Sequence, residues 1–160
     1  MKKPTMREMI WIGKGVWKER TYRSITAKAT DALFVTQSDE NFHFEGKIQT
    51  GNFSHGLIVT HLEKTYISVD LRENEILVHT VIQGFGSTVT IARNDQKEVV
   101  SFSLDRKGEE VSIAIQGQQV CQCNLPGSKK SIGFGFFYQE NQYYAVTDVM
   151  YQRQSIKSQQ

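Results

Sequence analysis

Paired carboxylates are the first chemistry to consider in this 160-residue chain. Cleavage of a glycosidic bond with retention needs a nucleophile and an acid about 5.5 Å apart, and two carboxylates on one strand can supply both. Asp70, Glu73 and Glu75 come closest to such a pair. Residues 72–75 read as a hairpin turn, where side-chain directions are not fixed, so solvated turn charges are the favoured interpretation.

The histidines and cysteines are the next candidates. His43 and Glu45 share one face of a predicted strand, as a general acid and base would, although polar residues on a sheet surface are the favoured alternative. Cys121 and Cys123 also share a strand face. They are too close in sequence for an ordinary disulfide and supply at best half a metal site, so we expect two free thiols.

A sugar-binding site is the third possibility. It needs a platform for the apolar face of a sugar ring, and polar groups that orient the hydroxyls. Aromatic side chains that could form the platform, or could instead fill the core, are Trp17, Tyr66, Phe137, Tyr138 and Tyr143. Polar side chains that could orient the hydroxyls are His43, Glu45, Lys47, Gln49, Asp70, Gln139 and Asn141. From these groups we predict a ligand site made of His43, Glu45, Gln49, Tyr66, Asp70, Tyr138, Gln139, Asn141 and Tyr143.

Strands must position these side chains. From Ile132 to Tyr138 large apolar residues alternate with Gly133 and Gly135, and residues 41–50 alternate between apolar and polar. A period of two is typical of a strand with one buried face. Glycine on the other face of residues 132–138 predicts the floor of a shallow groove, which a ligand can approach closely.

The whole chain repeats this pattern. About twelve short apolar segments are separated by turn residues roughly every 8–12 positions, and no segment has a helical period. The expected fold is all-β, a two-sheet antiparallel jelly-roll sandwich. We expect a tail or linker at 1–8, one domain at 9–151 and a polar C-terminal tail at 152–160. The first strands are predicted at 9–18, 22–29 and 31–36.

Charge and hydropathy limit the classes of partner that the sequence predicts. The net charge is +2, and residues 1–28 hold eight Lys or Arg against two Glu. No RNA- or DNA-binding motif accompanies this basic segment, so we expect no nucleic-acid partner. No apolar run reaches the roughly 18 residues of a membrane span, so we expect no membrane partner. No signal peptide is recognisable. These features predict a cytoplasmic protein; an extracellular location within a larger protein is the alternative.

No cofactor is expected. Oxygen donors that could hold a structural calcium ion lie in or near three predicted loops. They are Asp39-Glu40-Asn41, Asn94-Asp95 and Asp148. Because acidic turns usually bind only water, calcium is the minor alternative.

Three stretches together carry a resemblance to a known family. They are Phe42-x-Phe44-Glu45-Gly46-Lys47-Ile48 with Gly56-Leu57-Ile58-Val59, the hairpin from Val99 to Ile115, and Ile132-Gly-Phe-Gly-Phe136 with Ala145-Val-Thr-Asp148-Val149. Over residues 30–151 the chain resembles the concanavalin A-like, laminin G-type jelly roll. It is also similar to accessory modules of fructan- and xylan-degrading glycoside hydrolases.

The resemblance implies a curved sandwich whose concave face binds sugars. Fructan-binding relatives carry an arginine where this chain has Thr60 and His61, so a fructose site is not carried over. The carboxylate and lyase motifs of enzymes with this fold are missing as sets. We therefore expect a non-catalytic carbohydrate-binding module. A protein-interaction or structural module is the alternative, and a glycoside hydrolase or lyase of the same fold is the third hypothesis.

Overall fold

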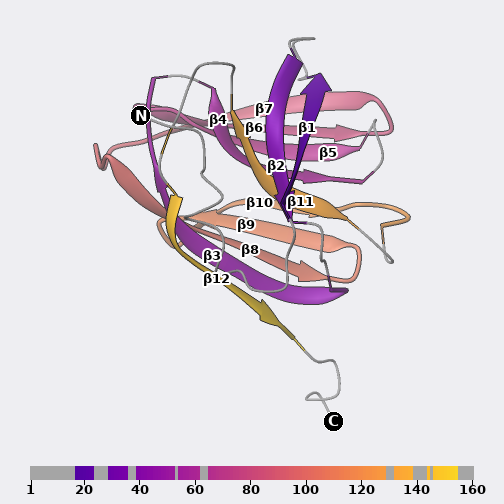
Figure 1. Cartoon of the computed structure of the whole chain (residues 1–160). Helices are drawn as coiled ribbons and strands as arrows, with labels where there is room; N and C mark the ends of the chain where they lie inside the picture. The colour runs from indigo at the N-terminus through magenta and orange to yellow at the C-terminus, as the bar shows by residue number, and fades with distance from the viewer. Residues whose placement is uncertain are drawn as a thin grey trace.

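The computed structural model describes residues 17–23, 29–35, 39–52, 54–61, 65–128, 132–138, 144 and 146–154, with the backbone alone for 17–23, 29–35 and 138. These residues form two stacked antiparallel sheets (Figure 1). No helix occurs among them, and hence none long and apolar enough to cross a membrane.

Seven strands form the first sheet, in the order β1-β2-β11-β4-β5-β6-β7. Their bounds are β1 Trp17–Arg23, β2 Ala29–Val35, β4 His55–Thr60, β5 Tyr66–Leu71, β6 Glu75–Ile82, β7 Phe85–Ala92 and β11 Gly133–Tyr138. Five strands form the second sheet, in the order β10-β9-β8-β3-β12. Their bounds are β3 Asn41–Gln49, β8 Val99–Lys107, β9 Glu110–Ile115, β10 Gln118–Asn124 and β12 Val146–Arg153.

The core lies between the two sheets and is rich in aromatic rings. Phe42 and Phe44 of β3 reach across to Phe134 of β11, with ring centroids 4.6 and 5.1 Å apart. Phe102 of β8 meets Phe136 of β11 at 5.6 Å. Offset and edge-on ring pairs at these distances stabilise a core beyond the burial of their area. The alternation read from residues 41–50 and 132–138 therefore sets the inner face of each sheet.

One sequence prediction, about the second face of the seven-stranded sheet, was wrong. Gly135 and Phe137, on the face of β11 opposite Phe134, are buried, and Phe137 is only 4% exposed. Ile58 of β4 and Tyr66 of β5 are also buried, at 4% and 7% exposure. The predicted shallow groove along residues 132–138 is therefore not open. The centre of the seven-stranded sheet is covered on both faces.

Several predicted boundaries differ from the structure. One strand occupies 17–23, across the gap between the strands predicted at 9–18 and 22–29. Gln83 and Gly84 form the turn between β6 and β7, and β7 begins directly after them at Phe85. β12 continues to Arg153, two residues into the predicted tail. The sequence pattern indicates that a strand is present in each region but does not define the residue at which it begins or ends.

Gly56 offers a test of the close strand packing. Its φ is +150°, and a Cβ added there would lie 1.9 Å from the carbonyl oxygen of Val69 on the neighbouring β5. We expect Gly56→Ala to cost about 3 kcal/mol or more of unfolding free energy, because backbone must move. Chemical denaturation measures this directly.

The control for this substitution is Gly108→Ala in the β8–β9 turn. Its φ is +61°, but nothing lies within 4 Å of the added Cβ. Only the cost of a left-handed alanine remains, about 1–2 kcal/mol. Equal losses in the two variants would contradict the argument from the Val69 carbonyl.

Candidate functional site

A charged cluster lies on the outer face of the five-stranded sheet. His43 projects from β3 between two carboxylates: its Nδ1 is 2.7 Å from Asp105 Oδ1, and its Nε2 is 2.8 Å from Glu45 Oε1. The alternation of β3 directs His43 and Glu45 outward, and the register places Asp105 of β8 directly opposite His43. The structure thus brings together two predicted site residues and adds a third.

This arrangement determines the charge of His43. Burial lowers the pKa of the imidazole, but the hydrogen bonds and charges of Asp105 and Glu45 outweigh that effect, so the pKa is raised above 6.5. Both ring nitrogens are occupied by carboxylates. His43 is therefore a poor general base, because no lone pair is left to accept a proton from a substrate.

Beside this cluster, the outer face of the sheet is hollowed where the central side chains are small. The hollow has a volume of about 340 Å³, and Ser101, Ser103 and Ala114 are among the residues that line it. His43, Glu45, Lys47 and Asp148 also line it, and Lys47 Nζ lies 3.5 Å from Asp148 Oδ2. We call this depression the sheet-face hollow.

Tyr66 and Asp70 do not join His43 and Glu45, because β5 belongs to the other sheet. Asp70 is 2% exposed and accepts hydrogen bonds from the Ser54 hydroxyl, the His55 backbone N–H and the Arg72 guanidinium. Burial raises the pKa of Tyr66. Both side chains are buried. Because its carboxylate is also engaged in hydrogen bonds within the protein, Asp70 is not available as the acid or nucleophile of a glycosidase.

The side chains of four other predicted site residues are not among those that the structure describes. Tyr138 pairs through its backbone with Asp31 of β2 and His55 of β4. Gln139, Asn141 and Tyr143 lie outside the described residues.

The two cysteines are free and partly buried on β10. Burial, together with the neighbouring Cys123, raises the pKa of Cys121 to about 11, and burial raises that of Cys123. Both groups are neutral thiols at pH 7, and only the thiolate is a strong nucleophile. This environment gives no support to a catalytic role for either cysteine.

The oxygen donors named for calcium, the minor alternative, lie in three separate places. Asp39 accepts a hydrogen bond from the Tyr151 hydroxyl, Asp95 from Arg93, and Asp148 faces Lys47. Within the described ranges, no three His, Cys, Asp or Glu side chains are grouped so that they could hold a metal ion.

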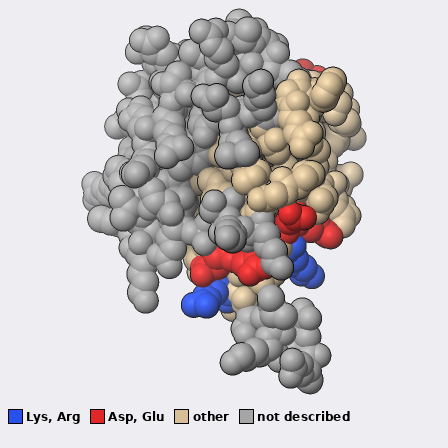
Figure 2. Space-filling view, turned by 90° about the vertical axis from the view of Figure 1, so that its right-hand side faces the viewer, with Lys and Arg blue, Asp and Glu red and all other residues tan. Residues whose placement is uncertain are grey.

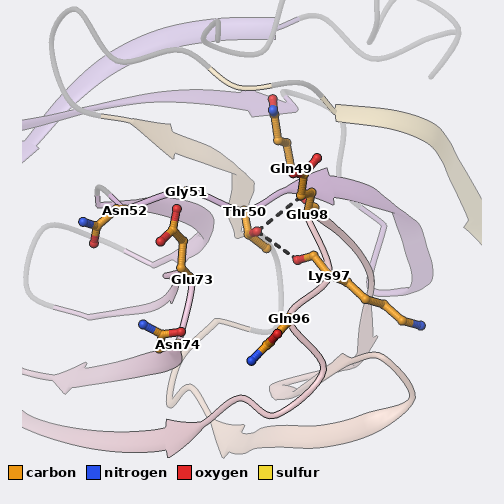
Figure 3. A pocket seen from close by; sticks show the side chains of 9 residues that line it. All are labelled: Gln49, Thr50, Gly51, Asn52, Glu73, Asn74, Gln96, Lys97 and Glu98. Atoms are coloured by element: carbon orange, nitrogen blue, oxygen red, sulfur yellow. Dashed lines mark hydrogen bonds between the residues drawn. The ribbon is translucent and has the colours of Figure 1, made fainter.

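A larger hollow, of about 670 Å³, lies at one end of the sandwich (Figure 3). Three segments meet there: the end of β3 with residues 50–52, the β5–β6 turn, and the loop from β7 to β8. Its lining is Gln49, Thr50, Gly51, Asn52, Glu73, Asn74, Gln96, Lys97 and Glu98. We call it the rim hollow.

Polar side chains line the rim hollow from opposite sides. Figure 3 shows Asn52 and Glu73 on one side and Gln49 and Glu98 on the other, while the Lys97 side chain points away. Among the described residues, the side chains of Asn52, Glu73, Asn74, Gln96 and Glu98 form no hydrogen bond. Amides and carboxylates are thus left to bind solvent or a ligand.

Arg93 connects two of the segments that line the rim hollow. Its side chain is 2% exposed and donates to the backbone carbonyls of Arg72, Glu73 and Lys97 and to the carboxylate of Asp95. Its backbone N–H donates to the Asn74 carbonyl. The β5–β6 turn and the β7–β8 loop are therefore fixed to each other through one guanidinium group.

The loop itself carries two signs of constraint. The hydrogen bonds from the Lys97 backbone N–H and the Arg93 side chain lower the pKa of Asp95. Gln96 has a φ of +54°, the left-handed conformation that non-glycine residues rarely adopt. Such positions concentrate at ligand-binding and active sites, where surrounding contacts hold them in place.

Sequence reasoning missed both Asp105 and most of the rim hollow. Asp105 could be assigned to an outward strand position, but not to the strand beside His43. Of the rim hollow only Gln49 was predicted. Its other members come from three turns that are distant in sequence, and each turn alone is typical of solvated surface. The sequence signal that could have indicated a constrained loop is Arg93 at the start of the polar segment 93–98, since an arginine can bond several loop carbonyls at once.

The pKa of His43 predicts a pH-dependent contribution to stability. A raised pKa means that the imidazolium stabilises the folded state fully below about pH 6.5, and that this contribution is lost as the pH rises through the folded pKa. We expect the stability lost in His43→Gln to be larger near about pH 5.5 than near about pH 9. Urea denaturation at the two pH values measures the difference.

His79 is the matched control, because burial lowers its pKa. Its protonation opposes folding, so the pH dependence of His79→Gln should have the opposite sign, with the variant gaining relative to wild type as the pH falls. The same sign in both variants would contradict the assignment of His43.

Arg93→Lys tests the guanidinium that holds the rim. Lysine keeps the charge but cannot bond four acceptors in a planar fork, so we expect a loss of about 2–3 kcal/mol of unfolding free energy. Arg153→Lys, at a side chain 80% exposed and 3.5 Å from Asp39, should change stability by less than about 0.5 kcal/mol. Denaturant titration of both variants would reveal similar losses if Arg93 were an ordinary surface residue.

Comparison with known proteins identifies structures that share the fold of this chain. No protein-family model matches the chain, and no curated protein does. Among solved structures, the carbohydrate-binding module CBM66 from Bacillus subtilis has a TM-score of 0.57 at 14% identity, over 85% of this chain and 94% of that one. A functionally unknown protein from Saccharomyces cerevisiae has a TM-score of 0.64 at 9% identity, over 90% and 98%.

A catalytic enzyme contains a similar unit. The xylan beta-1,4-xylosidase from Bacillus halodurans has a TM-score of 0.61 at 14% identity, and the match covers 85% of this chain but 32% of the enzyme. At identities of 9–14%, these structural matches show a shared fold alone. They confirm the predicted concanavalin A-like jelly roll and its likeness to modules associated with glycoside hydrolases.

Proposed function

We propose that the protein is a non-catalytic carbohydrate-binding module whose ligand binds in the rim hollow. The observation that carries the proposal is the group of amide and carboxylate side chains around that hollow that form no hydrogen bond with the described residues. Sugar hydroxyls both donate and accept, and such side chains match them in both directions. The fold shared with a carbohydrate-binding module supports the proposal.

The charges of the rim hollow indicate whether the sugar it binds is neutral or anionic. Glu73 and Glu98 face it, while the Lys97 side chain points away (Figure 3). Two carboxylates repel uronic acids and sulfated glycans, so the expected ligand is a neutral oligosaccharide. Affinity between millimolar and micromolar, about −4 to −8 kcal/mol, is the expected range.

A non-catalytic role is consistent with the surroundings of the two side chains considered for acid–base catalysis. Asp70 is buried and fully engaged, and His43 has both nitrogens occupied. The sheet-face hollow is lined by His43 and Glu45, two of the nine residues of the ligand site predicted from the sequence, and it is the competing location for a ligand.

Thermal shift and calorimetry against a panel of neutral and anionic oligosaccharides test the proposal. A ligand at about one hundred times its dissociation constant adds about 2.7 kcal/mol, which raises the melting temperature. We expect a shift with one neutral glycan class. In Asn74→Ala and Glu98→Ala the affinity should fall about tenfold, since each substitution removes one or two hydrogen bonds.

Glu45→Ala is the control, because it changes the sheet-face hollow and leaves the rim hollow intact. Unchanged binding in this variant supports the rim site. Loss of binding in Glu45→Ala, with wild-type affinity in Asn74→Ala and Glu98→Ala, would move the ligand to the sheet face. A folded sample that responds to no glycan in the panel would overturn the proposed function.

A protein-interaction module is the second candidate function. The specific observation that favours it is the exposed strand β7, on which two of the four exposed large hydrophobic side chains of the described residues lie.

A further inference from the structure

The four edge strands of the two sheets differ in how they are protected. An unprotected edge presents a row of unpaired backbone N–H and C=O groups, and proteins guard such edges with charges, proline, bulges or short strands. The edge strands here are β1, β7, β10 and β12.

Three of these edges carry a recognised form of protection. β1 has four charged residues among its seven: Lys18, Glu19, Arg20 and Arg23. β12 has an irregular register between Thr147 and Met150, where Asp148 adopts a left-handed φ of +52°. β10 has a register shift between Gln119 and Cys121.

β7 has none of these forms of protection. All eight of its residues pair in unbroken register with β6, and no Lys, Arg, Asp or Glu occurs from Thr80 to Ala92. Seven of the eight are exposed, with Phe85 at 85% and Val89 at 56%. A long, uncharged strand rich in β-branched residues is an aggregation hazard unless something covers it.

The surface around this strand is also uncharged. The β6–β7 turn lies at the upper right of Figure 1, and Figure 2 views the molecule from that side. In Figure 2 the described surface at the upper right is broadly tan, and the acidic and basic side chains gather mainly beneath it. The surface therefore offers no charge pattern by which a charged partner would be selected.

The turn geometry fixes which backbone groups of β7 face outward. Gln83 and Gly84 both have positive φ, +52° and +87°, as a two-residue type I′ turn requires. The residues that flank such a turn hydrogen-bond to each other, so Phe85 and every second residue after it bond to β6. The hydrogen bond from the Arg93 N–H to the Asn74 carbonyl agrees with this, because Arg93 belongs to the same alternating series of residues as Phe85. The outward groups consequently belong to Gly86, Thr88, Thr90 and Ala92.

These four residues are self-complementary. In an antiparallel pair of two β7 strands, Gly86 of one copy meets Ala92 of the other, and Thr88 meets Thr90. This single register uses every outward N–H and C=O, which gives about eight hydrogen bonds between the copies. The two-fold axis then passes between the two Val89 residues, at a non-hydrogen-bonded position where side chains approach most closely.

The side chains fit the same two-fold arrangement. Val89 and Ile91 share the face of the strand that carries the core residues Ile76 and Val78 of β6. Pairing would bring Val89 of one copy against Val89 of the other, with Ile91 as a diagonal neighbour opposite Ser87, and Thr88 and Thr90 would form cross-strand pairs on the opposite face. An isologous contact of this kind closes on itself and does not propagate.

From these observations we infer that β7 pairs antiparallel with β7 of a second copy, so that two chains form a dimer with one continuous sheet and a two-fold axis at Val89. The dimer does not depend on sugar binding at the rim hollow, and its test is independent of glycans.

Sedimentation velocity and light scattering on the full chain test this inference, from micromolar to millimolar concentration. We expect a monomer–dimer equilibrium in the wild type and a melting temperature that rises with concentration. Val89→Lys places two like charges across the axis and should weaken dimerisation by at least about tenfold, as should Val89→Glu. An equimolar mixture of these two variants should form a heterodimer, seen by native mass spectrometry.

Two further variants separate strand pairing from general surface effects. Thr90→Pro removes an outward N–H but no bond to β6, so it should abolish the dimer and leave a folded monomer by circular dichroism. Gln122→Lys, an exposed position on the other uncharged edge β10, should leave the dimer intact.

Four results would overturn the inference. They are a wild type that stays monomeric throughout, open-ended aggregation in place of a dimer, a dimer that survives both Val89→Lys and Thr90→Pro, and failure of the Lys and Glu variants to pair when mixed. Dissociation by Gln122→Lys alone would assign the interface to β10 and equally overturn it.

Discussion

Contact between aromatic rings across the two sheets is the constraint on which the rest of the structure depends. Phe42 and Phe44 pack against Phe134, and Phe102 packs against Phe136. Because side chains alternate along a strand, these inward rings decide the direction of every neighbouring residue. His43 and Glu45 face outward because Phe42 and Phe44 face inward, and a slip of one residue would reverse both sets. The charged cluster on the sheet face is thus a consequence of the core.

Two buried arginines fix the ends of the sandwich, where the sheets offer no ladder partners to the turns. Arg93 donates to carbonyls of the β5–β6 turn and the β7–β8 loop. Arg106, fully buried, donates to the carbonyls of Asp39, Gly108 and Ser128. Burial lowers the pKa of Arg106, yet a guanidinium stays charged at neutral pH, so both groups satisfy several acceptors at once. Arg93 thereby fixes two of the three segments that line the rim hollow relative to each other.

The two surfaces to which we assign binding differ in physical character. The rim hollow is concave and lined by amides and carboxylates, which suits a small polar ligand. The β7 edge is exposed and uncharged, and its outward backbone groups have no neighbouring strand, which suits another strand. A ligand in the rim hollow and a second chain on β7 would contact different residues, although both depend on the segment around Arg93 at the end of β7.

The sequence by itself determined the all-β class, the approximate number of strands and the inner face of β3 and β11, because these depend on a period of two that is visible locally. It also determined that His43 and Glu45 share a face. Only the tertiary structure decided that Asp105 lies beside His43, that Tyr66 and Asp70 belong to the other sheet and are buried, and that three distant turns enclose one hollow. Strand order and the covering of a second sheet face are set by contacts between residues far apart in sequence, and local alternation carries no record of which strands become neighbours.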